Sequence, residues 1–127
     1  MSIDGITENL TANHFKIIND QVYVKNNGNP GILLIHAHWC GHCKHFIPTF
    51  KNLSRKLNRY KHVYPCYAIE SDELTPVLSN ALSVQGFPTI KFFDQYGKII
   101  GNYDGNRSEQ SILENICKVY HHCIEYH

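Results

Sequence analysis

The sequence predicts an α/β domain in which a central mixed β-sheet carries helices on both faces. Short apolar segments alternate with amphipathic ones along the chain, which favours parallel strands joined by helices. Two late strands separated by a turn predict an antiparallel hairpin, and this hairpin makes the sheet mixed. The 127 residues, 43% of them hydrophobic, suit one domain that spans residues 1–127.

The first part of the chain contains two strand regions. Residues 1–13 are a polar lead-in by composition, and residues 14–25 hold two short apolar runs that are compatible with a strand or hairpin. A turn-forming stretch, NNGNPG, follows. Residues 32–37, ILLIHA, form a nearly continuous apolar run, which is the pattern of a strand buried on both faces.

The middle of the chain alternates helix and strand. Apolar residues within 46–57 recur at helical spacing and predict an amphipathic helix that ends near Arg59, with a kink at Pro48. Residues 62–69 predict a second strand, which Pro65 interrupts. Residues 71–82 predict a short helix, because acidic residues and a proline lie near its start.

The last part of the chain predicts a hairpin and a closing helix. Strands at residues 90–93 and 98–103 flank the turn DQYG. Ser108 has the character of a helix N-cap, and the apolar positions after it predict a helix that reaches Tyr120. Residues 121–127 read as a polar C-terminal tail.

Composition and charge argue against several kinds of partner. The formal net charge of +1 gives no general electrostatic case for binding nucleic acid or a membrane. No apolar run approaches the roughly 20 residues that span a bilayer. The N-terminus does not resemble a secretory signal and the C-terminus does not match a retention signal. A cytoplasmic location is therefore expected, with a virion or a lumen as alternatives.

The chain has five cysteines, an odd number that argues against a secreted disulfide framework, so the thiols are expected to be reduced. Cys66, Cys117 and Cys123 are most simply small buried or half-buried residues. Cys117 and Cys123 lie on different faces of the predicted helix and are not expected to pair. For Cys66 the alternative is a third thiol near the redox pair, able to trap Cys43.

Cys40 and Cys43 lie within the stretch WCGHC, between a buried strand and a helix. The first turn of a helix has amide groups without partners and the positive end of the dipole, and both stabilise a thiolate. The spacing places both sulfurs on one helix face, close enough to bridge. We therefore expect Cys40 to be the exposed attacking nucleophile and Cys43 the buried resolving thiol. No cofactor is required, since the sulfurs carry the electrons.

Other motifs strengthen this interpretation. WCGHCKHF is followed by Pro48, GFPT occupies residues 86–89, and YDGNR occupies residues 103–107. From about Phe15 to about Tyr120 the chain resembles the thioredoxin family, and Cys-Gly-His-Cys is typical of catalytic protein disulfide isomerase domains. The resemblance implies a thioredoxin-like fold and a protein thiol–disulfide oxidoreductase of the oxidase or isomerase kind. Its partners would be proteins with disulfides or dithiols, and a reductase or oxidase that recycles the pair.

The resemblance also implies roles for residues around the pair. Pro88 is expected in the cis form opposite the cysteines, and the Phe87 backbone is expected to pair with an extended substrate segment. The spacer residues Gly41 and His42 separate the sulfurs. A cationic His42 would favour the Cys40 thiolate, and hence a more oxidising pair. An apolar lip around Cys40 is expected from Trp39, Gly86 and Phe87.

Two positions depart from the family pattern. The family usually has a buried acid six residues before the first cysteine, where this chain has Leu34. A lysine is usual on the next strand, where Cys66 aligns. Deprotonation of Cys43 therefore needs another route, and the candidates are a water molecule, His36 or the released substrate thiolate.

Two further functions are weighed beside the enzyme. Leu34 favours a binding module of the same fold that holds polypeptides without turnover. A zinc-binding domain is the third possibility, because tetrahedral zinc accepts two cysteines and two histidines. Against zinc, His36 and His38 are expected to point together from the strand, while His42 and His45 lie on the helix. His38 and His45 are expected to be exposed, and no metal site is assigned.

Overall fold

The computed structural model describes residues 7–26, 28–58 and 64–120. Five strands form one mixed sheet in the order β1-β5-β4-β6-β7, in which β1, β5 and β4 run parallel while β6 and β7 complete it in antiparallel pairings. These strands are β1 (Glu8–Leu10), β4 (Gly31–His36), β5 (Cys66–Glu70), β6 (Thr89–Phe93) and β7 (Ile99–Tyr103).

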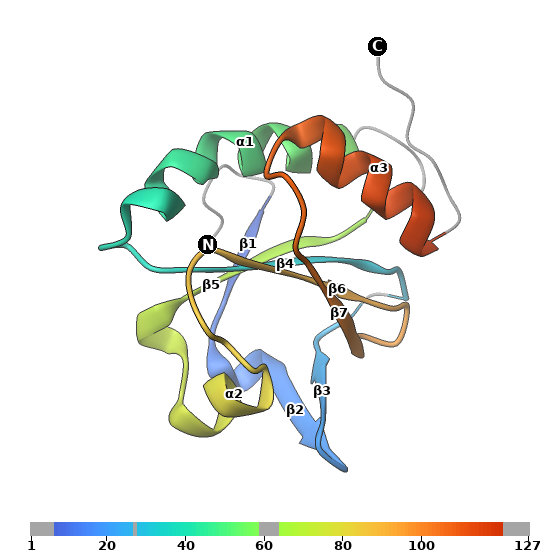
Figure 1. The fold of residues 1–127 in the computed structure, drawn as a ribbon. Coiled ribbons are helices and arrows are strands. Elements are labelled where there is room, and N and C mark those ends of the chain that lie inside the picture. The colour runs from blue at the N-terminus through green and yellow to red at the C-terminus, as the bar shows by residue number, and fades with distance from the viewer. Residues whose placement is uncertain (1–6, 27, 59–63, 121–127) are drawn as a thin grey trace.

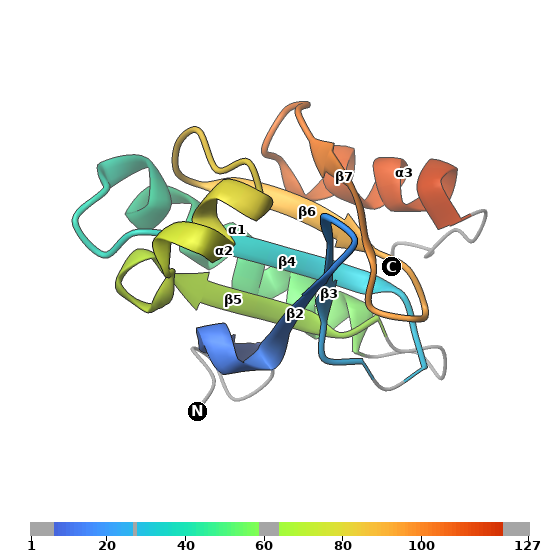
Figure 2. The ribbon, with the colours of Figure 1, turned by 90° about the horizontal axis from the view of Figure 1, so that it is seen from below.

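Helices and a hairpin cover the two faces of this sheet (Figure 1). Helices α1 (Gly41–Leu57) and α3 (Glu109–Tyr120) lie on one face, and the short helix α2 (Pro76–Ala81) lies on the other. An antiparallel hairpin of β2 (Phe15–Ile18) and β3 (Gln21–Val24) lies beside α2, and Figure 2 shows both over β4 and β5. The predicted mixed sheet with helices on both faces is confirmed.

Strand β4 lies at the centre of the molecule because both of its faces are apolar. All of its residues are buried. Ile32 and Leu34 belong to the core cluster under α1 and α3, whereas Leu33 and Ile35 belong to the cluster under α2 and the hairpin. A strand covered on both faces needs this continuous apolar pattern. Packing on both faces holds β4 in place, and the candidate site follows its C-terminal end at His36.

Helix α1 is held on the sheet by an apolar stripe. Phe46, Phe50, Leu53 and Leu57 recur at helical spacing, and none is more than 5% exposed. An ion pair between Lys56 and Glu109 joins α1 to α3. These contacts place the first turn of α1 above the end of β4. No helix in the part of the chain that the structure describes is long and apolar enough to cross a membrane.

The N-terminal segment differs from the prediction. Residues 8–10 form β1, which pairs in parallel with β5, so the polar lead-in assigned to residues 1–13 is wrong for these positions. Leu10 is the apolar residue of this three-residue strand, and it is 2% exposed. A strand with one apolar residue has no alternation for a sequence pattern to detect.

The region between β5 and β6 also differs. A 3₁₀ turn at Ser71–Glu73 precedes α2, because the Thr75 side chain accepts the Leu78 amide and caps a new helix with Pro76 in its first turn. The helix expected over 71–82 is therefore two short pieces. Strand β5 begins at Cys66, after Tyr64 and Pro65, and residues 62 and 63 of the predicted strand lie outside the described residues. The predicted tail, 121–127, lies outside the described residues.

Candidate active site

The two cysteines of WCGHC lie where β4 gives way to α1. Strand β4 ends at His36, a tight turn follows, and α1 begins at Gly41 with Cys40 as its N-cap residue. The Cys40 amide donates to the Ala37 carbonyl at 3.1 Å, which closes the turn. Cys40 is partly exposed, whereas Cys43, in the first turn of α1, is 1% exposed. An accessible thiol therefore lies next to a buried one.

The two thiols have opposite electrostatic surroundings. The amide N–H groups of Cys43 and His42 favour the Cys40 thiolate and lower the pKa of Cys40. Burial raises the pKa of Cys43 to about 11, although the Ala37 amide, 3.4 Å from its sulfur, acts in the opposite direction. The positive charge of Arg107 lowers the pKa of both thiols. Cys40 is therefore the thiol ready to attack, and Cys43 holds its proton.

An apolar lip borders Cys40. The rings of Trp39 and Phe87 meet edge to face with centroids 5.6 Å apart, and Trp39 is 62% exposed. The Cys40 thiol donates to the Phe87 carbonyl oxygen at 3.6 Å. The Phe87–Pro88 peptide bond is cis, as the family resemblance implied. An exposed aromatic pair beside a reactive sulfur can be covered by an apolar side chain of a bound polypeptide.

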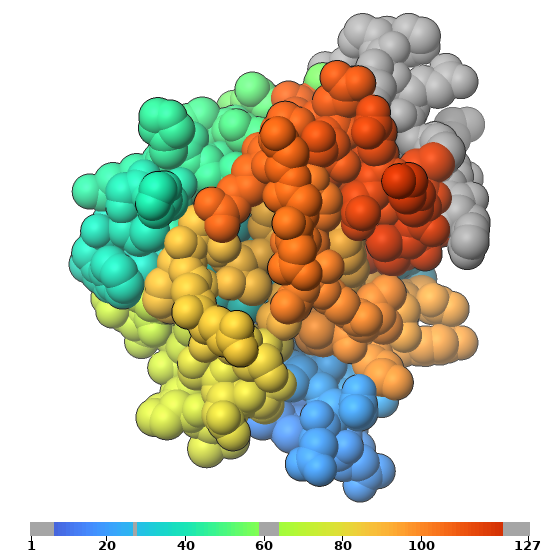
Figure 3. Space-filling view, viewed as in Figure 1, coloured from blue at the N-terminus to red at the C-terminus, as the bar shows by residue number. Residues whose placement is uncertain are grey.

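A groove of about 830 Å³ opens beside this lip, between the loop that ends at Pro88 and the segment that follows β7. Figure 3 shows these two segments, in gold and orange, on one face of the molecule. Phe87 belongs to both the lip and the groove, so the groove leads to Cys40. Gly86 also lies in its wall. Its polar side chains come from Ser83, Gln85, Thr89, Asn102, Tyr103, Asp104, Asn106 and Arg107.

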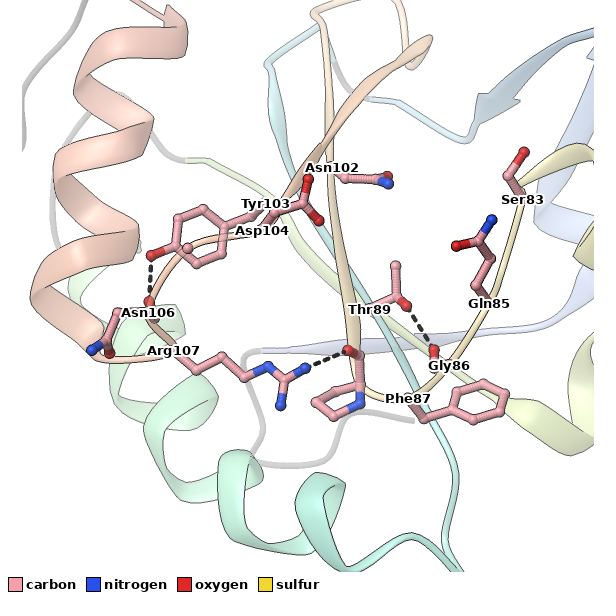
Figure 4. Close-up of a pocket in the computed structure, with 12 residues that line it drawn as sticks. Ser83, Gln85, Gly86, Phe87, Thr89, Asn102, Tyr103, Asp104, Asn106 and Arg107 are labelled. Carbon is pink, nitrogen blue, oxygen red and sulfur yellow. Dashed lines mark hydrogen bonds between the residues drawn. The ribbon is translucent and has the colours of Figure 1, made fainter.

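Arg107 is one of two site residues that were not predicted from the sequence. Figure 4 shows its side chain reaching across the groove, where its guanidinium donates to the Pro88 carbonyl at 3.4 Å. The loop that carries Arg107 is held by the Tyr103 hydroxyl, which donates to the Asn106 carbonyl. The segment YDGNRS contained a usable signal, because a single cation lies between turn residues and a helix cap.

Glu70, at the end of β5, anchors the turn that leads to Cys40. Its carboxylate accepts the His38 amide at 2.8 Å, the Asp72 amide at 2.6 Å and the Ser71 hydroxyl at 3.1 Å. Burial alone would raise the pKa of Glu70, but these donors outweigh burial and lower it. The sequence analysis did not identify Glu70, because its position opposite His36 depends on the register of β4 and β5.

Replacing Glu70 with glutamine is expected to lower the free energy of unfolding by about 1–2 kcal/mol at neutral pH, since a charged acceptor of several hydrogen bonds is lost. The folded pKa of Glu70 is lowered. Its contribution to stability is therefore complete above the unfolded carboxyl pKa, about 4.3, and is lost as the pH falls through the lower folded value. Chemical denaturation across this range measures both effects. Glu73→Gln, at an exposed position, is the control, and equal effects of the two variants would contradict the anchor.

Among the described residues, the histidines do not form a metal-ligand cluster with the two cysteines. His36 is 8% exposed, whereas the His38 side chain is 65% exposed, so the exposed position expected for His38 is confirmed. Strand β4 ends at His36, and the alternation does not continue to His38. His42 and His45 are exposed on α1. Within the described ranges, one group of three potential metal-ligand atoms lies within 4.8 Å of one another. It belongs to His38, Glu70 and Asp72, whose hydrogen bonds hold the turn before Cys40.

Cys66 lies away from the pair. It is the register partner of Ile32 at the start of β4, and its thiol donates to the Tyr64 carbonyl at 3.4 Å. The cysteine pair lies beyond the other end of β4, past His36, which is about 13 Å further along the strand. This separation argues against the alternative that Cys66 traps Cys43.

Cys117, in α3, is half-buried as expected, but it is disulfide-bonded, so the expectation of a reduced thiol is wrong for this residue. Cys117 and Cys123 are expected not to pair only if one helix continues over both of them. Helix α3 is described only as far as Tyr120, and Cys123 lies outside the described residues.

Comparison with known sequences gives related proteins of one kind. The thioredoxin family model matches residues 9–118. A thioredoxin of Borreliella burgdorferi is 33% identical over 98 residues, which are 77% of this chain and 80% of that protein. A protein disulfide-isomerase of Hordeum vulgare is 35% identical over 92 residues, or 71% of this chain. The chain spans only 18% of the length of that isomerase.

Comparison with solved structures gives the same fold. The first thioredoxin domain of mouse protein disulfide-isomerase A4 has a TM-score of 0.60 and 25% identity, and the match covers 84% of this chain and 78% of that one. The J-Trx1 fragment of ERdj5 has a TM-score of 0.71 at 15% identity, and the match covers 94% of this chain and 54% of the fragment.

Proposed function

We propose, from the premise that this chain belongs to the thioredoxin family, that it catalyses thiol–disulfide exchange on proteins through Cys40 and Cys43. The observation that carries the proposal is the asymmetry of the two thiols. One is accessible at the N-cap of α1 and has a lowered pKa, while the other is buried in the first turn and has a raised pKa. An accessible thiolate can attack a foreign disulfide, whereas a buried thiol can reach only the sulfur beside it.

Reduction of a substrate disulfide proceeds in two exchanges. The Cys40 thiolate attacks one substrate sulfur and bonds to it, the substrate S–S bond breaks, and the other substrate sulfur leaves as a thiolate that takes up a proton. Cys43 then loses its proton and attacks Cys40, so that the Cys40–Cys43 bond forms and the mixed disulfide breaks. The substrate has gained two electrons and the enzyme dithiol has lost two. The reverse sequence oxidises a substrate dithiol.

The surroundings of Cys40 support an oxidase- or isomerase-like role on polypeptides. Amides that stabilise its thiolate stabilise the reduced form, and a stabilised reduced form makes the disulfide a stronger oxidant. The Trp39–Phe87 lip offers an apolar contact beside the reactive sulfur, and the polar groove beyond it suits the main chain of an extended segment. The relatives named protein disulfide-isomerases support the same kind of reaction. A separate protein or small thiol would recycle the pair.

Two assays test the proposal on protein substrates. The chain is expected to accelerate both the reduction of insulin by a small dithiol and the oxidative refolding of reduced ribonuclease A in glutathione buffer. Cys40→Ser should return both rates to those of the buffer alone, because the attacking sulfur is removed. Cys66→Ala, far from the pair, is the control and should keep activity. If the unmodified chain binds these polypeptides but accelerates neither reaction, the enzyme proposal fails and the chain is a binding module.

A further inference from the structure

Cys43 needs a proton acceptor in the resolving exchange. Leu34, at the position where the family usually has a buried acid, does not supply one. Cys43 is 1% exposed, and burial holds its pKa far above neutrality. Leu34 faces α1 from β4 and lies in the apolar cluster with Phe46 and Phe50. A leucine cannot take a proton. The resolving exchange, which belongs to the function proposed above, therefore depends on another group near the Cys43 sulfur.

His36 lies on the same side of β4 as Leu34. Ile32 and Leu34 face the cluster under α1, and Leu33 and Ile35 face the opposite cluster. Because side chains alternate along a strand, His36 continues the face that looks toward α1. Helix α1 begins just after β4 ends, so its first turn, which carries Cys43, lies over this end of the strand.

The backbone limits how far His36 can be from the sulfur. The Ala37 nitrogen is 3.4 Å from the Cys43 sulfur. Two bonds of about 1.3 and 1.5 Å join that nitrogen to the His36 Cα, so the sulfur lies within about 6 Å of this Cα. An imidazole on that Cα can reach the sulfur directly or through one bridging water, which is the reach required of a general base.

The imidazole of His36 has an unused nitrogen. His36 is 8% exposed, and its Nδ1 atom is buried without a hydrogen-bond partner among the residues that the structure describes. Buried polar atoms normally have partners, so an orphaned nitrogen on a residue whose Cα lies within about 6 Å of the Cys43 sulfur requires an explanation. A nitrogen that receives a proton only during turnover satisfies that requirement.

We propose that His36 accepts the Cys43 proton in the resolving exchange. The proton moves from the Cys43 sulfur to Nδ1 of neutral His36, the Cys43 thiolate bonds to the Cys40 sulfur, and the bond from Cys40 to the substrate breaks. The substrate sulfur leaves as a thiolate and takes a proton from the His36 imidazolium or from solvent. The electrons move only among the sulfurs, so no further oxidant or reductant is needed.

The charges around His36 suit this task. Burial lowers the pKa of His36, and the Glu70 carboxylate on β5 opposes this lowering. The net direction keeps the ring neutral at neutral pH, in the form that accepts a proton. The titratable groups of α1 nearest to it are Cys43, whose sulfur is 3.4 Å from the Ala37 nitrogen, and Cys40, and the positive charge of Arg107 lowers the pKa of both thiols. From β6, the register partner of Ile35 is Thr89, which does not titrate in this range.

The test follows the two exchanges separately in a single turnover. Reduced chain is mixed with a peptide disulfide, quenched with acid, alkylated and weighed by mass spectrometry, so that mixed disulfide and Cys40–Cys43 disulfide are counted. His36→Gln is expected to slow the second exchange at least about tenfold at neutral pH and to leave the first unchanged. In the unmodified chain the rate of the second exchange should rise with pH as His36 loses its proton, and this rise should be absent in His36→Gln. His45→Gln, on the exposed face of α1, is the matched control.

Two further measurements keep the proposal falsifiable if His36→Gln folds poorly. Adding Leu34→Glu to His36→Gln supplies a carboxylate on the same face, and it should restore part of the lost rate. In the unmodified fold, the nitrogen resonances of His36 should titrate differently in the reduced chain and in Cys43→Ser, whereas those of His45 should not.

A second exchange that keeps its rate and pH profile in His36→Gln would overturn the proposal, as would identical His36 titrations in the reduced chain and Cys43→Ser. If no Cys40–Cys43 disulfide forms even in the unmodified chain, the oxidoreductase function itself fails, and this result is distinct from the loss of the His36 role.

Discussion

Replacing Cys43 with serine is expected to turn the chain into a trap that holds its substrates as mixed disulfides on Cys40. The first exchange survives, because Cys40 keeps its exposure and most of the groups that lower its pKa. The second exchange is lost. A thiol held in place acts at an effective concentration of about 10⁵ M or more, so external thiols at millimolar concentration release the substrate orders of magnitude more slowly.

Mass spectrometry of the products after incubation with a disulfide-containing protein measures this trap. The double variant with Cys40→Ser and Cys43→Ser is the control, since it keeps the lip and the groove but has no attacking sulfur. The account is contradicted if Cys43→Ser turns over as fast as the unmodified chain, or if the adducts form on a cysteine other than Cys40.

Cys40 is expected to react with iodoacetamide at least about a hundredfold faster than Cys43 at neutral pH. Burial raises the pKa of Cys43 from the ordinary 9.0 to about 11, and each unit reduces the thiolate fraction about tenfold. The pKa of Cys40 is lowered instead, chiefly by the Cys43 amide, so more of it is thiolate at the same pH. The near-complete burial of Cys43 adds to the difference.

Peptide mapping after timed alkylation gives the two rates. The same reaction in denaturant is the control, because unfolding removes both the amides and the burial and should bring the rates together. Equal rates in the folded chain would show that the first turn of α1 does not separate the two thiols, and the assignment of nucleophile and resolving thiol would fail.

The position of the cysteine pair could be predicted because each step depends on local sequence. A continuous apolar run predicts a strand buried on both faces, and periodic apolar residues predict α1, so the two cysteines must lie at their junction. The contrast between an exposed Cys40 and a buried Cys43 follows from the start of a helix that packs on that strand. The contact between Trp39 and Phe87 could not be predicted from local sequence, because it joins two segments far apart in the chain. Only the resemblance to a family predicted it.

The remaining features depend on register and on loops, which local patterns do not determine. Glu70 reaches the turn before Cys40 because β5 pairs with β4 in one particular register. Strand β1 has a single apolar residue, and its pairing with β5 determines its structure. Arg107 reaches the thiols from a loop whose path is held by Tyr103 and Asn106. His38 lies in the turn after β4 ends at His36, so the alternation of a strand does not determine where its side chain lies.

The reduction potential of the Cys40–Cys43 pair tests the central claim most directly. The chain would be equilibrated in glutathione buffers of graded ratio, its remaining thiols trapped by alkylation, and the oxidised fraction at these two cysteines measured by mass spectrometry. We predict one reversible two-electron transition, with a potential nearer the value of about −180 mV for protein disulfide isomerase than the value of about −270 mV for thioredoxin. A pair that shows no reversible transition across the glutathione range would contradict the account.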